Sequence, residues 1–296
     1  MIEPVFFLAI LISFVSFGVQ MPLMVQYVRK YDGLVVTTIR NLSLVITMAP
    51  LLFLATTEEI ASVIPFLPKL LLASFLGTLS FIASLNASKY IPVGITYATR
   101  QVAYVSLTML MGVLLFLEML SSVQTFLLIA LVVCGVVLAY TRSENAHLNQ
   151  HDAWKGISLA LFAGVFHAAT FYFFTDVARN INPFVASYFW EIFVGFFALA
   201  IFCIQKVCTT YTQTLSIPRR DVLAITAIGL LTLSGTGGYA FAVNHGPFAL
   251  ASGLVTLSTV VAVVVARILF KEKLSPVQML LIALIVCVLI AIKLVS

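Results

Sequence analysis

The stretch that decides the fold is residues 244–278, which read NHGPFALASGLVTLSTVVAVVVARILFKEKLSPVQ. Between its Gly-Pro pair and its KEK triplet lies an apolar run, 248–270, whose only charged residue is Arg267. A helix needs about 20 mostly apolar residues to cross a bilayer. The stretch therefore predicts one membrane-spanning helix with a polar connection at each end.

The whole chain shares this apolar composition. It has 296 residues, of which 62% are hydrophobic and only 9% are charged, whereas soluble domains have about 25% charged residues. A soluble fold could not bury so much apolar surface. The four cysteines form no CxxC pair and no cluster with histidine, so neither a metal site nor a disulfide is indicated. We expect an all-α integral membrane protein.

Ten segments qualify as membrane-spanning helices, and short polar gaps separate them. No gap could hold a soluble catalytic domain, so any cavity must come from the helices themselves. The predicted spans are residues 4–27, 34–55, 66–88, 93–117, 123–141, 154–178, 183–206, 221–243, 248–270 and 276–295.

The polar connection after 248–270 has a counterpart in the first half of the chain. Pro247 precedes Glu272 by 25 residues, and Pro92 precedes Glu118 by 26 residues. In both halves a glutamine follows six residues after the glutamate. Several agreeing offsets indicate an internal repeat.

We therefore divide the chain into two five-helix repeats, 1–141 and 154–296, joined by a polar linker, 142–153. A repeat with an odd number of spans starts its second copy from the opposite membrane face. The halves are then inverted relative to each other around a central cavity, as in many secondary transporters.

Two pairs of short segments carry a family resemblance. The first half reads ASKYIPV at 87–93 and FLEMLSSVQ at 116–124; the second reads NHGPF at 244–248 and LFKEKLSPVQ at 269–278. These segments resemble the signature of EamA-type members of the drug/metabolite transporter superfamily, and Arg40 lies where that family often has an arginine. Met119 departs from the usual basic residue, and Arg100 has no counterpart in the second half.

The resemblance implies a 5+5 inverted repeat, a central substrate cavity, and movement of metabolites without ATP hydrolysis. Because the family handles amino acids, sugars, nucleotide derivatives and drugs, the substrate stays open.

Four ionisable residues lie within predicted spans. A charge at a helix centre costs about 2.5–3.5 kcal/mol on insertion scales. At about 1.5 Å per residue, the two arginines lie ~10–12 Å below one membrane face and the glutamate ~12 Å below the other. In a core about 30 Å thick, these depths approach the midplane from both sides. We expect these residues to share one cavity: Arg40, Arg100, His167 and Glu191.

Two interpretations of these residues stay open. In the first, Arg40 and Arg100 bind a carboxylate or phosphate, Glu191 holds an amino group or carries a coupling proton, and His167 titrates near neutral pH. In the second, the roles are structural: Arg40 or Arg100 pairs with Glu191 and ties the two halves together, or caps exposed carbonyls.

Aromatic residues near these charges are candidates for the cavity wall. Two tyrosines stand three residues before and four residues after Arg100 and so share its helix face. A run of small residues, SGTGG at 234–238, predicts close helix approach or local unwinding. The aromatic candidates are Tyr97, Tyr104, Trp190 and Tyr239.

The sequence contains no HExxH, GxSxG or Walker motif and no paired carboxylate at catalytic spacing, so we expect neither an enzyme nor a cofactor. We predict a secondary active transporter or exchanger that moves a small polar metabolite, anionic or zwitterionic, by alternating access. The alternatives are an intramembrane lipid-modifying enzyme and a channel.

The expected partners are the small-molecule substrate and the lipid bilayer, with no nucleic acid and no assigned oligomeric state. The expected location is a bacterial plasma (inner) membrane, as a multi-pass protein.

Charge and resemblance give opposite predictions for orientation. Of the 16 Lys and Arg residues, Arg40 and Arg100 lie inside spans; eleven of the other fourteen fall on one predicted face and three on the other. The positive-inside rule then predicts both termini outside, whereas the resemblance implies both termini inside.

Overall fold

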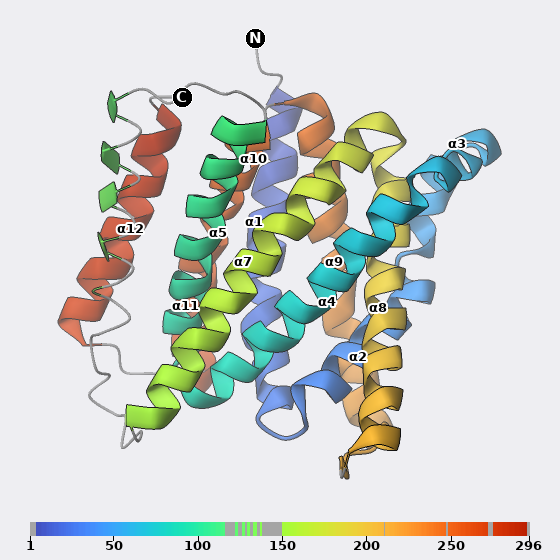
Figure 1. Ribbon diagram of the computed structural model, residues 1–296, viewed down its shortest axis with the longest axis horizontal. Helices are drawn as coiled ribbons and strands as arrows, with labels where there is room; N and C mark the ends of the chain where they lie inside the picture. The colour runs from blue at the N-terminus through green and yellow to red at the C-terminus, as the bar shows by residue number, and fades with distance from the viewer. Residues whose placement is uncertain are drawn as a thin grey trace.

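The computed structural model describes residues 4–115, 150–209, 211–246, 248–271 and 275–294, and isolated positions between 122 and 137. The regular elements in this part of the chain are all helical, and Figure 1 shows them side by side as a bundle. The start of α1 and the last turns of α12 lie at the same end of the bundle (Figure 1). The elements are α1 (Pro4–Val28), α2 (Gly33–Thr47), η1 (Ala49–Leu54), α3 (Thr57–Ala61), η2 (Ile64–Phe66), α4 (Leu67–Tyr90), α5 (Val93–Leu115), α7 (Gln150–Asn180), α8 (Pro183–Cys208), α9 (Arg219–His245), α10 (Phe248–Val255), α11 (Ser258–Phe270) and α12 (Pro276–Leu294).

Within these described residues, six helical segments are long and apolar enough to cross a membrane. Two more apolar helices, Ser258–Phe270 and Pro276–Val288, are shorter. The predicted count of ten stays a prediction. Most of the predicted span 123–141 and of the linker 142–153 lies outside the described residues, as do the motif residues Glu118, Pro247 and Glu272.

The predicted single span 248–270 is wrong in one respect, because two helices, α10 and α11, replace it. The amides of Leu257 and Thr259 donate to the carbonyls three residues earlier, each at 3.0 Å. Such bonds belong to a tighter helical turn than the α-helix. The sequence gives no sign of this turn, because the junction between the two helices contains no proline and no charged residue.

The predicted span 34–55 also changes character along its length. After α2 the chain continues as the 3₁₀ helix η1, with Pro50 in its first turn. Proline lacks an amide hydrogen and disfavours α conformation in the residue before it. The connection that follows, expected to be a loop, contains α3, whose start is a capping box between Thr56 and Glu59.

The helices of the two halves interleave. Helix α1 of the first half packs against α9 and α11 of the second half. Helix α7 of the second half packs against α4 and α5 of the first half. In addition α2 packs against α8 and α9, α4 against α8, and α5 against α11. Elements distant in sequence therefore enclose the centre of the bundle together.

Hydroxyl groups join the two closest helix pairs. Ser13 on α1 donates to the carbonyl of Gly235 on α9 at 2.7 Å, and the hydroxyls of Ser16 and Ser234 lie 2.8 Å apart. On the other side Ser80 of α4 donates to the carbonyl of Ala163 on α7 at 2.8 Å. Small residues allow backbones to approach closely enough for such bonds. The close approach predicted for 234–238 is confirmed.

One turn, residues 29–32, ties several elements at the end of the bundle opposite the N-terminus (Figure 1). The carboxylate of Asp32 accepts from the amide of Leu34 at 2.9 Å and so caps α2. It also pairs with Lys89 at 3.2 Å and accepts from the Tyr211 hydroxyl at 2.9 Å. Burial raises the pKa of Asp32, but these three partners outweigh burial and hold its pKa below the usual value.

Glycine at position 164 sets the distance between α7 and α5. A Cβ at Gly164 would lie 2.4 Å from the carbonyl oxygen of Arg100 and 2.6 Å from the Ala103 side chain. We expect Gly164→Ala to lower the melting temperature of the purified protein by several degrees, because backbone must move to admit the methyl group. Gly237→Ala is the matched control, since its nearest neighbours would lie at 3.7 Å. Equal melting temperatures for the two variants would contradict this close packing.

Two substitutions of Asp32 distinguish the effect of its N-cap hydrogen bond on stability from the effect of its charge. Asp32→Ala removes both, and loss of an N-cap costs about 1 kcal/mol; Asp32→Asn keeps a capping oxygen and loses only the charge. We expect the order of stability to be wild type, then Asn, then Ala. Because the folded pKa is lowered, the charge stabilises above the usual carboxyl pKa of about 4 and its contribution disappears as the pH falls through the folded value. Melting curves at neutral and acidic pH should show the gap between wild type and Asp32→Asn closing in acid, and a gap that widens would refute the assignment.

Candidate functional site

A cavity of about 70 Å³ lies near the middle of the bundle, walled by helices from both halves of the chain. Its wall mixes aromatic rings with amides and charged groups. The lining residues are Phe17, Gln20, Met21, Arg40, Gly77, Ser80, Phe81, Tyr97, Arg100, Gln101, His167, Phe171, Trp190, Glu191, Val194, Val255 and Ser258.

All four of the ionisable residues singled out from the sequence line this cavity, and so do two of the four aromatic candidates. The expectation that the charges meet at one level therefore agrees with the geometry. The six are Arg40, Tyr97, Arg100, His167, Trp190 and Glu191.

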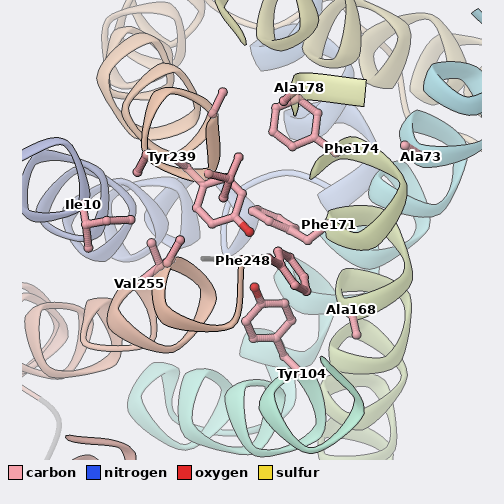
Figure 2. Packing of buried hydrophobic residues seen from close by; sticks show 14 of the residues in the cluster. Ile10, Ala73, Tyr104, Ala168, Phe171, Phe174, Ala178, Tyr239, Phe248 and Val255 are labelled. Atoms are coloured by element: carbon pink, nitrogen blue, oxygen red, sulfur yellow. The ribbon is translucent and has the colours of Figure 1, made fainter. Parts of the chain in front are cut away.

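Tyr104 and Tyr239 do not line the cavity; they are buried in an aromatic cluster beside it. Figure 2 shows both hydroxyl groups pointing into the middle of that cluster, near Phe171 of α7. The Tyr239 hydroxyl lies 3.0 Å from the Ser252 hydroxyl. Helical spacing predicted that Tyr104 shares the helix face of Arg100. Tyr104 lies one turn farther along the helix, however, and so stands behind the cavity wall. Its ring packs against His167, with 4.9 Å between the ring centroids.

Arg40 and Glu191 form a buried ion pair across the two halves. The Nη1 of Arg40 on α2 lies 3.1 Å from the Oε2 of Glu191 on α8, and both side chains are almost wholly buried. The guanidinium also lies 4.8 Å from the centre of the Phe81 ring. This contact is the pairing that one of the two sequence interpretations described.

Four neutral side chains complete the environment of the pair, and sequence reasoning missed them. The Glu191 carboxylate also accepts from the Asn41 amide at 3.1 Å and from the Thr236 hydroxyl at 2.7 Å. Arg40 donates to Asn41, to Gln20 and to Thr232. An amide within an apolar span has to find partners in a membrane, so Gln20 and Asn41 could have been noticed by the same argument that selected the charges.

Arg100 has a different environment from Arg40. Among the residues that the structure describes, no carboxylate pairs with it. Its Nη1 donates to the Ser84 hydroxyl at a long 3.4 Å, and its guanidinium carbon lies 4.3 Å from the centre of the Tyr97 ring. Its Nε is buried with no hydrogen-bond partner in the described part of the chain. The cation is therefore held in place by an aromatic face while donors remain available.

Three other residues that line the cavity also have buried polar atoms without a partner among the described residues. These atoms are the Nε of Arg40, the indole Nε1 of Trp190 and the amide oxygen of Gln101. Buried polar atoms are nearly always hydrogen-bonded in proteins. Donors and an acceptor left over on one cavity wall are typical of a site that receives a polar ligand.

The charges of the cavity leave one positive charge without a counter-charge. Arg40 and Glu191 neutralise each other, and Arg100 remains. The described residues hold no group of three or more His, Cys, Asp or Glu that could bind a metal ion. The arrangement is therefore suited to binding a small anion by electrostatic attraction and hydrogen bonds.

Comparison with known proteins agrees with the fold and supplies a family. A crystal structure of a protein with 14% sequence identity superposes with a TM-score of 0.65, covering 96% of this chain and 97% of that chain. At this identity the likeness shows a shared fold alone. No curated protein matches the sequence.

The model of the EamA-like transporter family matches residues 154–294, which contain α8, α9 and the glutamate of the buried ion pair. The several apolar helices agree with an integral, multi-pass membrane protein. Residues 154–294 are therefore similar to the EamA-like transporter family, which is part of the drug/metabolite transporter superfamily.

Proposed function

We propose that this protein is a secondary active transporter or exchanger that moves a small polar metabolite bearing an anionic group by alternating access. The observation that carries the proposal is Arg100, a buried cation on the wall of a central cavity with no acidic partner among the described residues. A charge is kept in such a place at a cost of about 2.5–3.5 kcal/mol on insertion scales, which marks it as functional by default.

The proposed architecture is ten spans in two inverted repeats, 1–141 and 154–296, with the linker 142–153 between them. The helix contacts support it, because they come in matched pairs. Exchanging the two halves converts the contact of α1 with α9 into that of α7 with α4, and the contact of α1 with α11 into that of α7 with α5. It converts the contact of α4 with α8 into that of α9 with α2. Inverted repeats of this kind carry alternating access in many secondary transporters.

The two ends of the bundle carry different contacts, which suits a gate at each end. At one end Lys30 pairs with Asp221, and Asp32 pairs with Lys89. At the other end the Asn182 amide donates to Glu59 at 3.1 Å. Asn182 caps α8 as Asp32 caps α2, so the two caps occupy corresponding places in the two halves. Each alternating state would break one set and keep the other.

The family favours transport over the other two candidate functions, which were an intramembrane lipid-modifying enzyme and a channel. We place the protein in a bacterial plasma (inner) membrane.

Transport assays test the role of Arg100. Purified protein in liposomes should take up labelled organic anions from a panel of small carboxylates and phosphates. We expect Arg100→Ala to lower the initial rate at least tenfold, because no other unpaired cation lines the described cavity. Arg267→Ala, which removes an exposed arginine charge, should leave the rate unchanged. If Arg100→Ala moves every anion as fast as wild type, the proposed role of Arg100 is wrong.

The buried pair should behave as a structural unit. Arg40→Met alone leaves the Glu191 carboxylate buried without its cation, and breaking such a pair costs about 3–5 kcal/mol. Adding Glu191→Gln removes the orphaned charge, so we expect the double variant to melt at a higher temperature than Arg40→Met. Thermal melting of the purified single and double variants measures this coupling. A double variant less stable than either single variant would show that the pair is not a unit.

A further inference from the structure

We propose that the cavity selects a monoanionic carboxylate with an apolar body, held by Arg100, and that it rejects the zwitterion of the same size. This inference rests on the proposed transport function and names the class of its substrate.

Arg100 specifies the charged end of the ligand, and Trp190 adds a second unpaired donor to the wall of the same cavity. Arg100 is 7% exposed and Trp190 is 6% exposed, and both line the cavity. The guanidinium Nε and the indole Nε1 have no partner among the described residues. A carboxylate accepts several hydrogen bonds at once, and charge-assisted bonds from arginine are the strong ones.

Arg100 has contacts that hold it in place before any ligand arrives. Its guanidinium carbon lies over the Tyr97 ring, 4.3 Å from the ring centre, and its Nη1 donates to the Ser84 hydroxyl at 3.4 Å. The buried Nε has no partner among the described residues and can donate to a ligand. Preorganised donors lose less entropy when they bind.

The same cavity lacks a free anion to balance an ammonium group. Glu191 is the one carboxylate among the cavity-lining residues, and it already accepts from Arg40, Asn41 and Thr236. An ammonium group entering the cavity would meet the Arg100 charge and find no free carboxylate, with only the neutral amide oxygen of Gln101 as an unpaired acceptor. A zwitterion therefore gains binding free energy from the contact between its carboxylate and Arg100, but desolvation of its ammonium group offsets most of that gain.

The rest of the wall is apolar and aromatic, including Phe17, Phe81 and Phe171. A body of hydrocarbon fits such a wall, whereas a second carboxylate would find no further unpaired cation among the lining residues. The net charge of plus one matches a single negative charge.

Fluorescence of Trp190 offers a direct measurement of binding. The chain has two tryptophans, and Trp154→Phe leaves Trp190 as the only one. In this variant, titration with propionate should change the emission saturably. Propionamide, which has nearly the same shape and no charge, and alanine, which is a zwitterion, should each bind at least tenfold more weakly.

Substitution of the arginine in the same background identifies the partner of the carboxylate. Arg100→Gln should weaken propionate binding at least tenfold, and Arg100→Lys should give an intermediate value because it keeps the charge and loses the planar fork. Arg267→Gln is the control for loss of a surface arginine and should bind as the parent does. Size-exclusion profiles and melting temperatures show which variants are folded. If Arg100→Gln is not folded, the affinity of Arg100→Lys for propionate decides the test.

Each outcome decides the inference. Equal affinity for propionate and propionamide, or an unchanged affinity in folded Arg100→Gln or Arg100→Lys, overturns the anion site. Alanine binding as tightly as propionate overturns the exclusion of zwitterions. Quenching by chloride as strong as by propionate shows a site for inorganic ions and overturns the carboxylate assignment. Because binding is read without transport, a protein that binds propionate but moves no solute would refute the transport function alone.

Discussion

The buried pair of Arg40 and Glu191 is the interaction on which the centre of the bundle depends. Neither charge could remain alone at this depth, since desolvating an ion costs several kcal/mol. Their contact joins α2 to α8, and the hydroxyl and amide partners extend it to α9 and α1. Helices from both halves are thus fixed at one level around a shared polar centre. The cavity lies against this centre, so its shape follows from the requirement that these two charges be satisfied.

Neutralisation of Arg40 gives Arg100 its distinct character. If Glu191 were free, it would attract either arginine or a cationic ligand, but its oxygens are already occupied by three donors. Arg100 instead rests on the Tyr97 ring, an interaction that stabilises a desolvated cation by about 2 kcal/mol without removing its positive charge. An aromatic face thus makes the arginine tolerable inside the membrane, whereas a carboxylate partner would have cancelled its field. This difference separates a structural arginine from one available to a ligand.

The positions of most helices and the meeting of the charges could be predicted from the sequence, because both follow from one-dimensional quantities. Hydropathy and length place spans such as 183–206 within a few residues of α8, and helical rise puts Arg40 and Glu191 at similar depth. The partner of Glu191 could not be predicted, because two arginines had suitable depths and rotation about the helix axis decides between them. Displacement along the helix, and not rotation, placed Tyr97 at the cavity and Tyr104 behind it. The turn between α10 and α11 escaped prediction since its cause lies in backbone hydrogen bonds within an unbroken apolar run.

The cavity is flanked by buried apolar side chains in both directions, and this arrangement bears on how a transporter of this kind could open. Toward the end that holds Asn182, the buried rings of Phe171, Phe174 and Tyr239 pack against one another. Toward the opposite end a second buried apolar cluster runs from Met21 at the cavity to Val28, beside the charged contacts of residues 30–32. Separating either cluster exposes apolar surface at about 25 cal/mol per Å², whereas partly exposed ion pairs contribute at most about 1 kcal/mol each. Opening at either end therefore has to offset the loss of buried apolar contacts, which is a larger cost than breaking the charged contacts.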